Sequence, residues 1–185
     1  KTILPHFPLR EQNQLRVPKM RVGSKAVGTA RNIVYTSYEE KYSHMADVLT
    51  KSAGITLTIF PTRAALRAFL LHAPNFAGAT IFEPEQPAAA RRSAYIQIRE
   101  GRVKHILTTK TGIFGPFPML ATVIIDDDEH PAHKQYDQQP YPDSRTLGSV
   151  LATKAGATLH RYMQAPRVPL WFHTAKTHER FTTIG

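Results

Sequence analysis

Runs of β-branched and apolar residues alternate in this chain with segments whose apolar side chains recur at helical spacing. The runs that predict strands lie at 55–60, 79–82, 104–109, 122–125 and 157–163. Such alternation is typical of βαβ units, in which successive strands run parallel. We therefore predict an α/β domain of three layers, in which a mostly parallel central sheet lies between two layers of helices.

Local signals mark the ends of the predicted helices. Ser37 and Glu40 match a capping box, in which each side chain accepts a hydrogen bond from the backbone amide of the other residue. A helix should begin there. Thr62 and Pro74 bound a second helix, and Gly156 ends a third. The side chains expected to face the core from these helices are Tyr38, Tyr42, Met45, Leu49, Leu66, Phe69, Leu70, Leu147, Val150 and Leu151.

The length of 185 residues suits one domain. We expect an extended basic leader or arm at 1–25, a main lobe at 26–168 and a C-terminal tail at 169–185. No apolar stretch approaches the roughly 20 residues that a membrane helix needs, and the first residues lack the pattern of an export signal. The cytoplasm is therefore the expected location.

The charge of the chain favours a polyanionic partner. Lys and Arg number 24 against 14 Asp and Glu, so the formal net charge is +10 and the isoelectric point is near 10.0. Because a basic surface attracts phosphates, nucleic acid is the first candidate. The sequence contains no cysteine, which excludes disulfides, thiol catalysis and cysteine-ligated metal sites.

Basic residues gather around the predicted strand at 104–109. Arg91, Arg92 and Tyr95 precede it, and Lys110 follows it. Basic side chains on one helix face can contact phosphates, and an aromatic ring can stack on a base. We expect these four residues to contact nucleic acid; the alternative is an ordinary exposed helix.

Four acidic residues, Asp126 to Glu129, directly follow the run at 122–125. Crowded carboxylates raise one another's proton affinity and often hold a cation, although a solvated strand end is the alternative. His130 and His133 beside them invite a transition-metal site, but the proline between them spoils the helical presentation of such a pair.

Ligands of parallel sheets bind beyond the carboxyl ends of the strands. We therefore expect one functional rim that combines the turn at 28–32, the acidic run at 126–129 and the turn after Met163.

Several motifs resemble those of the primosomal replication-restart helicase, protein N′. They are Lys110-Thr111-Gly112-Ile113-Phe114-Gly115-Pro116-Phe117-Pro118, Val123-Ile124-Ile125-Asp126-Asp127-Asp128, His133-Lys134-Gln135-Tyr136, Ile59-Phe60-Pro61 and Tyr162-Met163-Gln164-Ala165-Pro166. The resemblance spans about residues 25–168 and is to the first motor lobe of that family, so it implies a P-loop NTPase (RecA-like) helicase lobe. The chain offers no counterpart of the family's second motor lobe or of its zinc-binding cysteines.

The same resemblance places the end of a phosphate loop at Gly28-Thr29-Ala30-Arg31-Asn32-Ile33-Val34-Tyr35. It implies nucleotide contacts from Gly28, Thr29, Arg31 and Asn32, with ATP and Mg²⁺ as the candidate cofactors. A working loop needs glycines whose amides wrap the phosphates, a Lys for the β/γ oxygens and a Ser or Thr for magnesium. Ala30, Arg31 and Asn32 stand in those places, so we expect weak ATP binding or none.

In the acidic motif the resemblance allows two alignments. Without a gap, Asp126 falls on the magnesium-organising Asp and Asp127 on the catalytic Glu. These two residues are then the expected metal ligands, and Asp127 the expected catalytic residue. An Asp is one methylene shorter than a Glu, so it would hold a general base back from the attacking water. A shift by one residue would instead align the motif with Asp127 to His130.

Together these features predict a degenerate helicase-derived lobe that binds DNA, hydrolyses ATP weakly or not at all, and acts in DNA replication restart or repair. Replication or repair proteins are candidate partners, and no membrane contact is expected. Two alternatives stay open: a divergent DNA-dependent ATPase fragment whose second lobe is absent, and a non-catalytic module that binds another protein.

Overall fold

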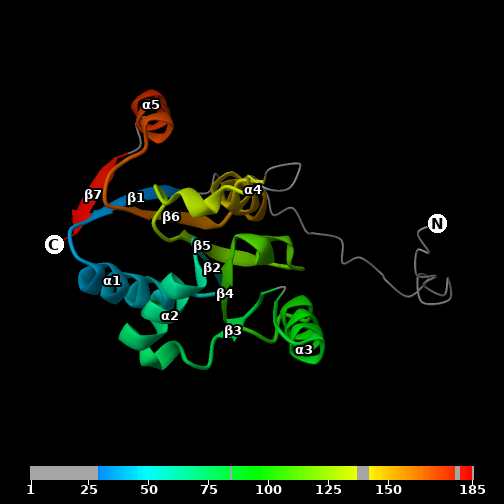
Figure 1. Ribbon diagram of the computed structural model, residues 1–185. Helices are drawn as coiled ribbons and strands as arrows, with labels where there is room; N and C mark the ends of the chain where they lie inside the picture. Colours follow the sequence, from blue (N-terminus) through cyan, green and yellow to red (C-terminus); the bar gives the residue numbers. More distant parts are fainter. Residues whose placement is uncertain (1–28, 84, 137–141, 178–179, 185) are drawn as a thin grey trace.

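The computed structural model of the protein describes residues 29–83, 85–136, 142–177 and 180–184, and the predicted leader at 1–25 lies outside them (Figure 1). The strands are β1 (Ala30–Tyr35), β2 (Ile55–Phe60), β3 (Thr80–Ile81), β4 (His105–Thr109), β5 (Leu120–Ile125), β6 (Thr158–Met163) and β7 (Phe181–Ile184). The α-helices are α1 (Tyr38–Lys51), α2 (Arg63–His72), α3 (Ala88–Arg99), α4 (Ser144–Ala155) and α5 (Val168–Thr177). Short 3-10 turns lie between them at η2 (Pro74–Phe76), η3 (Lys110–Phe114) and η4 (Pro131–His133).

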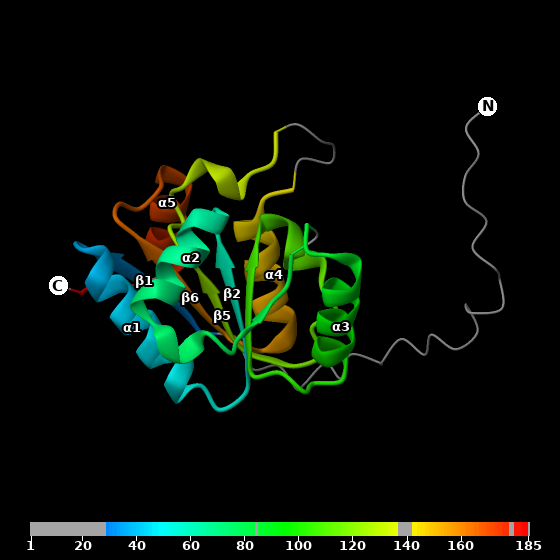
Figure 2. The ribbon, with the colours of Figure 1, turned by 60° about the horizontal axis from the view of Figure 1, so that its bottom comes forward.

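The described strands form a seven-stranded sheet in the order β3-β4-β2-β5-β6-β1-β7, and every pairing in it is parallel. Helices α1 and α2 cover one face of this sheet, and α3 and α4 cover the other (Figure 2). The predicted three-layer α/β domain with a parallel central sheet is confirmed. Since the strands share one direction, their carboxyl ends meet along one edge, which we call the carboxyl rim.

The sequence signals for helix ends are confirmed at α1, α2 and α4. Ser37 Oγ accepts a hydrogen bond from the Glu40 amide at 3.2 Å, and Thr62 Oγ1 accepts one from the Ala65 amide at 3.1 Å. Gly156 ends α4 with a φ of 66°, a left-handed conformation that costs glycine little. These caps satisfy backbone groups that would otherwise lack partners at the helix ends.

The sheet separates two apolar layers. The layer under α1 and α2 buries Tyr42, Met45, Leu49, Leu66 and Phe69, which confirms five of the predicted core positions. On the opposite face, helices α3 and α4 pack against β2, β4, β5 and β6 through Ala94, Ile98, Ala152, Leu57, Ile59, Ile106, Val123, Ile125 and Leu159. Both layers run the length of the strands, so the rim residues are held on a rigid support.

Two predicted core positions are wrong. Tyr38 is 51% exposed and Val150 is 43% exposed. Helix α4 instead packs on the sheet through Gly148 and Ala152. A Cβ added at Gly148 would lie 2.9 Å from Ile59 Cδ1. The helix therefore approaches the sheet through its smallest residues, and this approach turns Val150 outward.

The segment at 169–185 is not a simple tail. It carries most of α5 and all of β7, and β7 pairs parallel with β1 and so joins the central sheet. Its four residues are partly exposed, which explains why the sequence gives only a weak strand signal there. No helix in the described ranges is long and apolar enough to cross a membrane.

We expect Gly112→Ala to destabilise the fold by about 2–3 kcal/mol, because overpacking a rigid core carries such a cost. A Cβ at Gly112 would lie 1.8 Å from Thr108 Oγ1 and 2.3 Å from the Phe82 carbonyl oxygen. Chemical denaturation measures the change. The matched control is Gly78→Ala, where nothing lies within 4 Å of the new atom. Equal unfolding free energies for the two variants would contradict the packing described here.

Candidate functional site

The carboxyl rim brings the acidic run against the start of α1. β5 ends at Ile125, so Asp126 is the first residue on the rim. β1 ends at Tyr35, and only two residues, Thr36 and Ser37, separate it from α1. Lys41 lies one turn into α1, and its side chain is fully buried. A buried lysine at a rim of carboxylates is the centre of the site.

The ammonium of Lys41 lies between two carboxylates. Its Nζ is 2.8 Å from Asp126 Oδ1 and 2.8 Å from Asp127 Oδ1. The Tyr35 hydroxyl donates a hydrogen bond to the same oxygen of Asp127. Asp127 also has a φ of 47°, in the left-handed region that residues other than glycine seldom adopt. Its contacts with Lys41 and Tyr35 hold it in this conformation.

Three tyrosine rings surround the ammonium. Their centroids lie 4.9 Å (Tyr35), 4.6 Å (Tyr38) and 4.4 Å (Tyr42) from Lys41 Nζ. These distances are within cation–π range, so the rings stabilise the charge while they exclude water from it. We call Lys41, the two carboxylates and the three tyrosines the Lys41 site.

The pKa values at this site reflect a competition between burial and pairing. Burial would lower the pKa of Lys41, but the charges of Asp126 and Asp127 outweigh it and hold that pKa above its ordinary value. Burial raises the pKa of Asp126, which Lys41 opposes and Asp127 reinforces. The raised pKa of Lys41 keeps the proton on the ammonium, whereas the raised pKa of Asp126 would draw a proton to the carboxylate. Because Lys41 Nζ lies 2.8 Å from both carboxylates, the geometry favours the charged lysine and hence the ion pair. Burial and the bond to Asp127 raise the pKa of Tyr35, so its hydroxyl keeps the proton that it donates.

The other two acids of the run are held by the segment that follows β6. Arg167 Nε lies 2.7 Å from Asp128 Oδ2, and the Gln164 amide donates to Glu129 Oε1 at 2.8 Å. The amide of Asp128 donates to the Tyr162 carbonyl at 2.8 Å. The predicted rim is therefore correct in joining the acidic run to the turn after Met163.

A buried histidine, His133, holds the backbone of the acidic run. His133 Nε2 lies 2.7 Å from the Asp126 carbonyl, which can only accept, so this nitrogen carries the proton. Its Nδ1 lies 2.8 Å from Ser144 Oγ, and burial lowers the pKa of His133, which favours the neutral ring. Arg145 Nη1 adds a hydrogen bond to the Asp128 carbonyl at 3.0 Å. Both ring nitrogens of His133 therefore contact groups of the protein, which is a structural role and not the metal-binding role considered from the sequence.

The residues predicted to form a phosphate loop do not lie on the rim. Arg31 and Asn32 are in β1, where they pair with His160 and Arg161, and Thr29 precedes that strand. Gly28 lies outside the described residues. Asn32 is buried and its Oδ1 accepts from Arg161 Nη1 at 3.1 Å. The expected turn is therefore a strand, because Ile33 and its neighbours pair with β6 and β7, and its start lies at the opposite edge from Asp126.

The strand-to-helix turn on the rim does not fit a phosphate loop either. It consists of Thr36 and Ser37, whereas the loop motif places several residues between the strand and the Lys that opens the helix. Tyr38 and Glu39 open α1 here, and Glu40 adds a second carboxylate to the first turn. These acids complement the helix dipole and would repel a phosphate.

Magnesium ligation by Asp126 and Asp127 does not fit this geometry, because the Lys41 ammonium already occupies the space between them. Among the described residues, no group of three or more His, Cys, Asp or Glu side chains is arranged to hold a metal ion. The crowded carboxylates do hold a cation, but it is a side chain of the same protein.

Three of the four residues predicted to contact nucleic acid lie on α3, on the other face of the sheet from α1. Arg91, Arg92 and Tyr95 are exposed on α3, whose buried side carries Ala94 and Ile98. Lys110 is partly exposed at the carboxyl end of β4. The three α3 residues thus share the solvent side of one helix, apart from the Lys41 site.

The sequence contained a signal for Lys41. It follows Tyr38 by three residues and precedes Met45 by four, so it falls on the apolar stripe of the predicted helix. A lysine at such a position needs a buried partner of opposite charge, and the acidic run supplies it. Sequence reasoning missed the pair because periodicity predicts burial and does not predict which elements meet.

No family model matches this chain, and no curated protein matches it. Solved structures do. The C-terminal domain of S. cerevisiae Dbp5, bound to Gle1 and IP6, has a TM-score of 0.61 and 12% identity over 85% of this chain and 89% of its own. E. coli SrmB, a DEAD-box protein bound to regulator of ribonuclease activity A, has a TM-score of 0.59 and 13% identity over 86% and 91%. S. cerevisiae Dbp5 bound to RNA and ADP BeF3 has a TM-score of 0.60 and 11% identity over 87% of this chain and 42% of its own.

At these identities the likeness is one of fold. This chain has the RecA-like fold of a helicase lobe, as the sequence predicted. It spans most of the isolated Dbp5 domain and less than half of the longer Dbp5 chain.

We expect Lys41→Met to lower the unfolding free energy by about 3–5 kcal/mol near neutral pH, because it leaves two buried carboxylates without their cation. Stability should then rise as the pH falls. The pKa of Asp126 is raised in the folded state, and more so without Lys41, so the folded protein binds a proton that the unfolded chain binds only at lower pH. Urea titrations at several pH values measure both effects.

Two further variants make this result specific. Lys51→Met changes a lysine of the same helix whose side chain is 77% exposed, and it should change stability by no more than about 0.5 kcal/mol. Adding Asp126→Asn to Lys41→Met should restore part of the loss. If the Lys41 and Lys51 variants unfold alike at neutral pH, the buried ion pair does not stabilise the fold as described.

Proposed function

We propose that this chain is a helicase-derived lobe that binds DNA and does not turn over ATP, and that it acts in DNA replication restart or repair. The observation that carries the proposal is the Lys41 ammonium between Asp126 and Asp127, at 2.8 Å from each. By the motif resemblance, Asp126 and Asp127 would face magnesium and the attacking water in a motor lobe, and here a lysine side chain lies between them.

The loss of ATP turnover is supported by the chemistry of the rim. A general base must reach the attacking water. Asp127 Oδ1 instead accepts from Tyr35 and faces Lys41, and the residue is 8% exposed. The two-residue turn before α1 offers few amides to a phosphate, and the helix that follows begins with acidic residues. These features speak against the alternative of a divergent ATPase fragment.

Binding of DNA is supported by charge and exposure. The net charge of +10 gives a general attraction for phosphates, and α3 exposes Arg91 and Arg92 next to Tyr95. The similar structures include Dbp5 bound to RNA. The motif resemblance to protein N′ favours DNA over RNA for this chain.

Descent from a first motor lobe of the protein N′ type is part of the proposal. It is supported by the acidic run at the end of β5 and by its contacts with the segment after β6, where that family has its motifs. The Dbp5 domain with the similar fold is a C-terminal domain, so fold likeness alone does not distinguish the two kinds of lobe.

We expect Arg91→Glu with Arg92→Glu to weaken binding to a fluorescent duplex DNA at least tenfold at about 50 mM salt, similarly for unrelated sequences. Affinity of the unchanged protein should fall steeply as salt rises. Lys51→Glu with Arg67→Glu makes the same change in net charge on α1 and α2 and should weaken binding less. Fluorescence anisotropy measures all three proteins. Equal losses for the two double variants would place the interface elsewhere than on α3, and salt-independent binding would overturn the electrostatic account.

We expect millimolar ATP with Mg²⁺ to leave the thermal unfolding midpoint unchanged, because a ligand that binds the folded state must raise it. Phosphate release should stay at the background rate with and without DNA. A clear rise of the midpoint, or phosphate release that DNA stimulates and Asp127→Asn abolishes, would refute the loss of ATP turnover and favour a divergent motor.

A further inference from the structure

Helix α5 presents large apolar side chains to solvent at the end of the molecule remote from α3. In Figure 1 it stands clear of the sheet layers beside β7, whereas α3 lies near the β3–β4 edge. Among residues 168–176 of this helix, whose burial the structure describes, only Leu170 and Thr174 are buried. Val168 is 69%, Trp171 57% and Phe172 63% exposed. A cluster of this kind is costly in water, so it indicates a surface for a partner.

Two of the aromatic rings are already arranged in parallel. Trp171 and Phe181 of β7 have ring centroids 5.6 Å apart and planes only 15° from parallel. The indole stays more than half exposed in this arrangement. Phe172, its neighbour on α5, is exposed as well. Flat, rigid rings that are exposed next to an ordered stack are suited to receive another aromatic plane.

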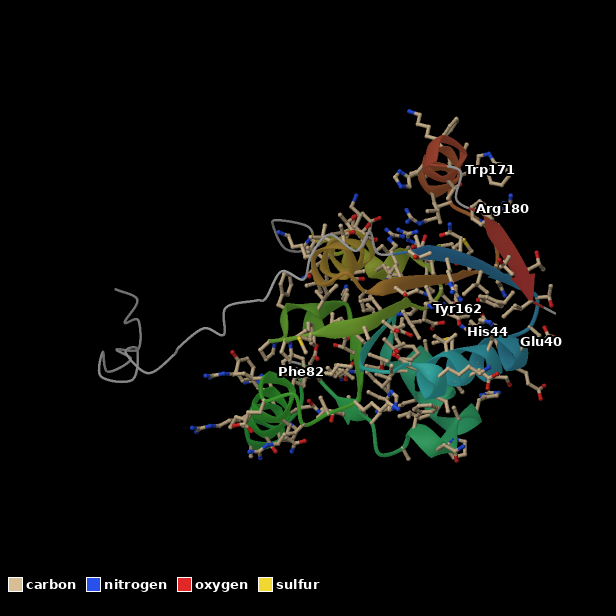
Figure 3. All side chains as sticks on the ribbon, turned by 180° about the vertical axis from the view of Figure 1, so that it is seen from behind. Glu40, His44, Phe82, Tyr162, Trp171 and Arg180 are labelled. Carbon is tan, nitrogen blue, oxygen red and sulfur yellow. The ribbon has the colours of Figure 1, made fainter. Side chains whose placement is uncertain are left out.

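The charged side chains that the structure describes on α5 and at the start of β7 are basic. Lys176 and Arg180 are exposed beside them, and Figure 3 shows Trp171 and Arg180 close together at this end of the molecule. The described residues 168–177 and 180–184 include no acidic residue. An apolar protein interface would not need this one-sided charge, whereas a phosphate backbone would be attracted by it.

We infer that α5 and the start of β7 form a second nucleic-acid surface, which binds unpaired bases by stacking them on Trp171 and Phe172 while Lys176 and Arg180 contact phosphates. Duplex DNA hides the faces of its bases, so the ligand is a single strand. This surface adds to the proposed function, and it is separate from α3 because the two helices lie toward opposite edges of the sheet.

Trp171 is the one tryptophan in the sequence, so its fluorescence reports on this surface directly. Oligothymidylate of about 16 nucleotides, a length that such surfaces can cover, is the probe. We expect it to quench the emission of Trp171 in a saturable manner, and a blunt duplex of equal length to quench it far less. The quenching should persist in the Arg91→Glu, Arg92→Glu variant, whose change lies on α3.

The variant of choice is Phe172→Ala, which we expect to weaken binding of the oligothymidylate about tenfold in anisotropy titrations, since the loss of one stacked base has an effect of this order. Phe114→Ala removes the same side chain at a comparably exposed position, 69% against 63%, and should leave binding unchanged. Circular dichroism checks that both variants are folded, and the quenching of the unchanged protein does not depend on either.

Three outcomes would overturn the inference. The first is anisotropy that shows binding of the oligothymidylate without quenching of Trp171, and the second is equal affinity for the Phe172→Ala and Phe114→Ala variants. The third is a dimer, seen by sedimentation and abolished by Phe172→Ala, which would make this surface an interface between copies of the chain. If duplex binding through α3 persists in these cases, only the second surface fails; if neither nucleic acid binds, the proposed function fails as well.

Discussion

A single buried cation organises the functional edge of this protein. Lys41 compensates the charges of Asp126 and Asp127, which would otherwise repel each other in a water-excluded site. Its attraction fixes α1 against the end of β5, two elements far apart in the sequence. A buried ion pair of this kind gains little net free energy, but breaking it is expensive. The pair therefore acts mainly to specify which elements meet at the rim.

The rest of the rim is built around that pair. His133, Arg145 and Arg167 hold the backbone and side chain of the acidic run, and the segment after β6 receives Glu129. Each carboxylate of the acidic run contacts at least one group of the protein itself. Under the proposed function, these internal contacts take the place of the groups that serve hydrolysis in a motor lobe.

The alternation of strands and helices was sufficient to predict the parallel sheet and its layers, and the caps at Ser37, Thr62 and Gly156 were local enough to be predicted correctly. Predictions that depend on tertiary contacts failed. Arg31 and Asn32 resemble a loop motif, yet strand pairing on both sides draws them into β1. Lys41 pairs with Asp126 and Asp127, which follow it by 85 and 86 positions, and local periodicity cannot predict so distant a contact. Short β7 becomes a strand because β1 offers it an open edge.

The short connection between β1 and α1 limits what point substitutions could do at this edge of the sheet. Point substitutions can change side chains, but they cannot add the amides that a phosphate requires. A phosphate-binding turn at this place would therefore demand an insertion after Tyr35, and a longer turn would move α1 and break the contact of Lys41 with both carboxylates. The ion pair thus sets an upper limit on how long this turn can be while α1 stays in place.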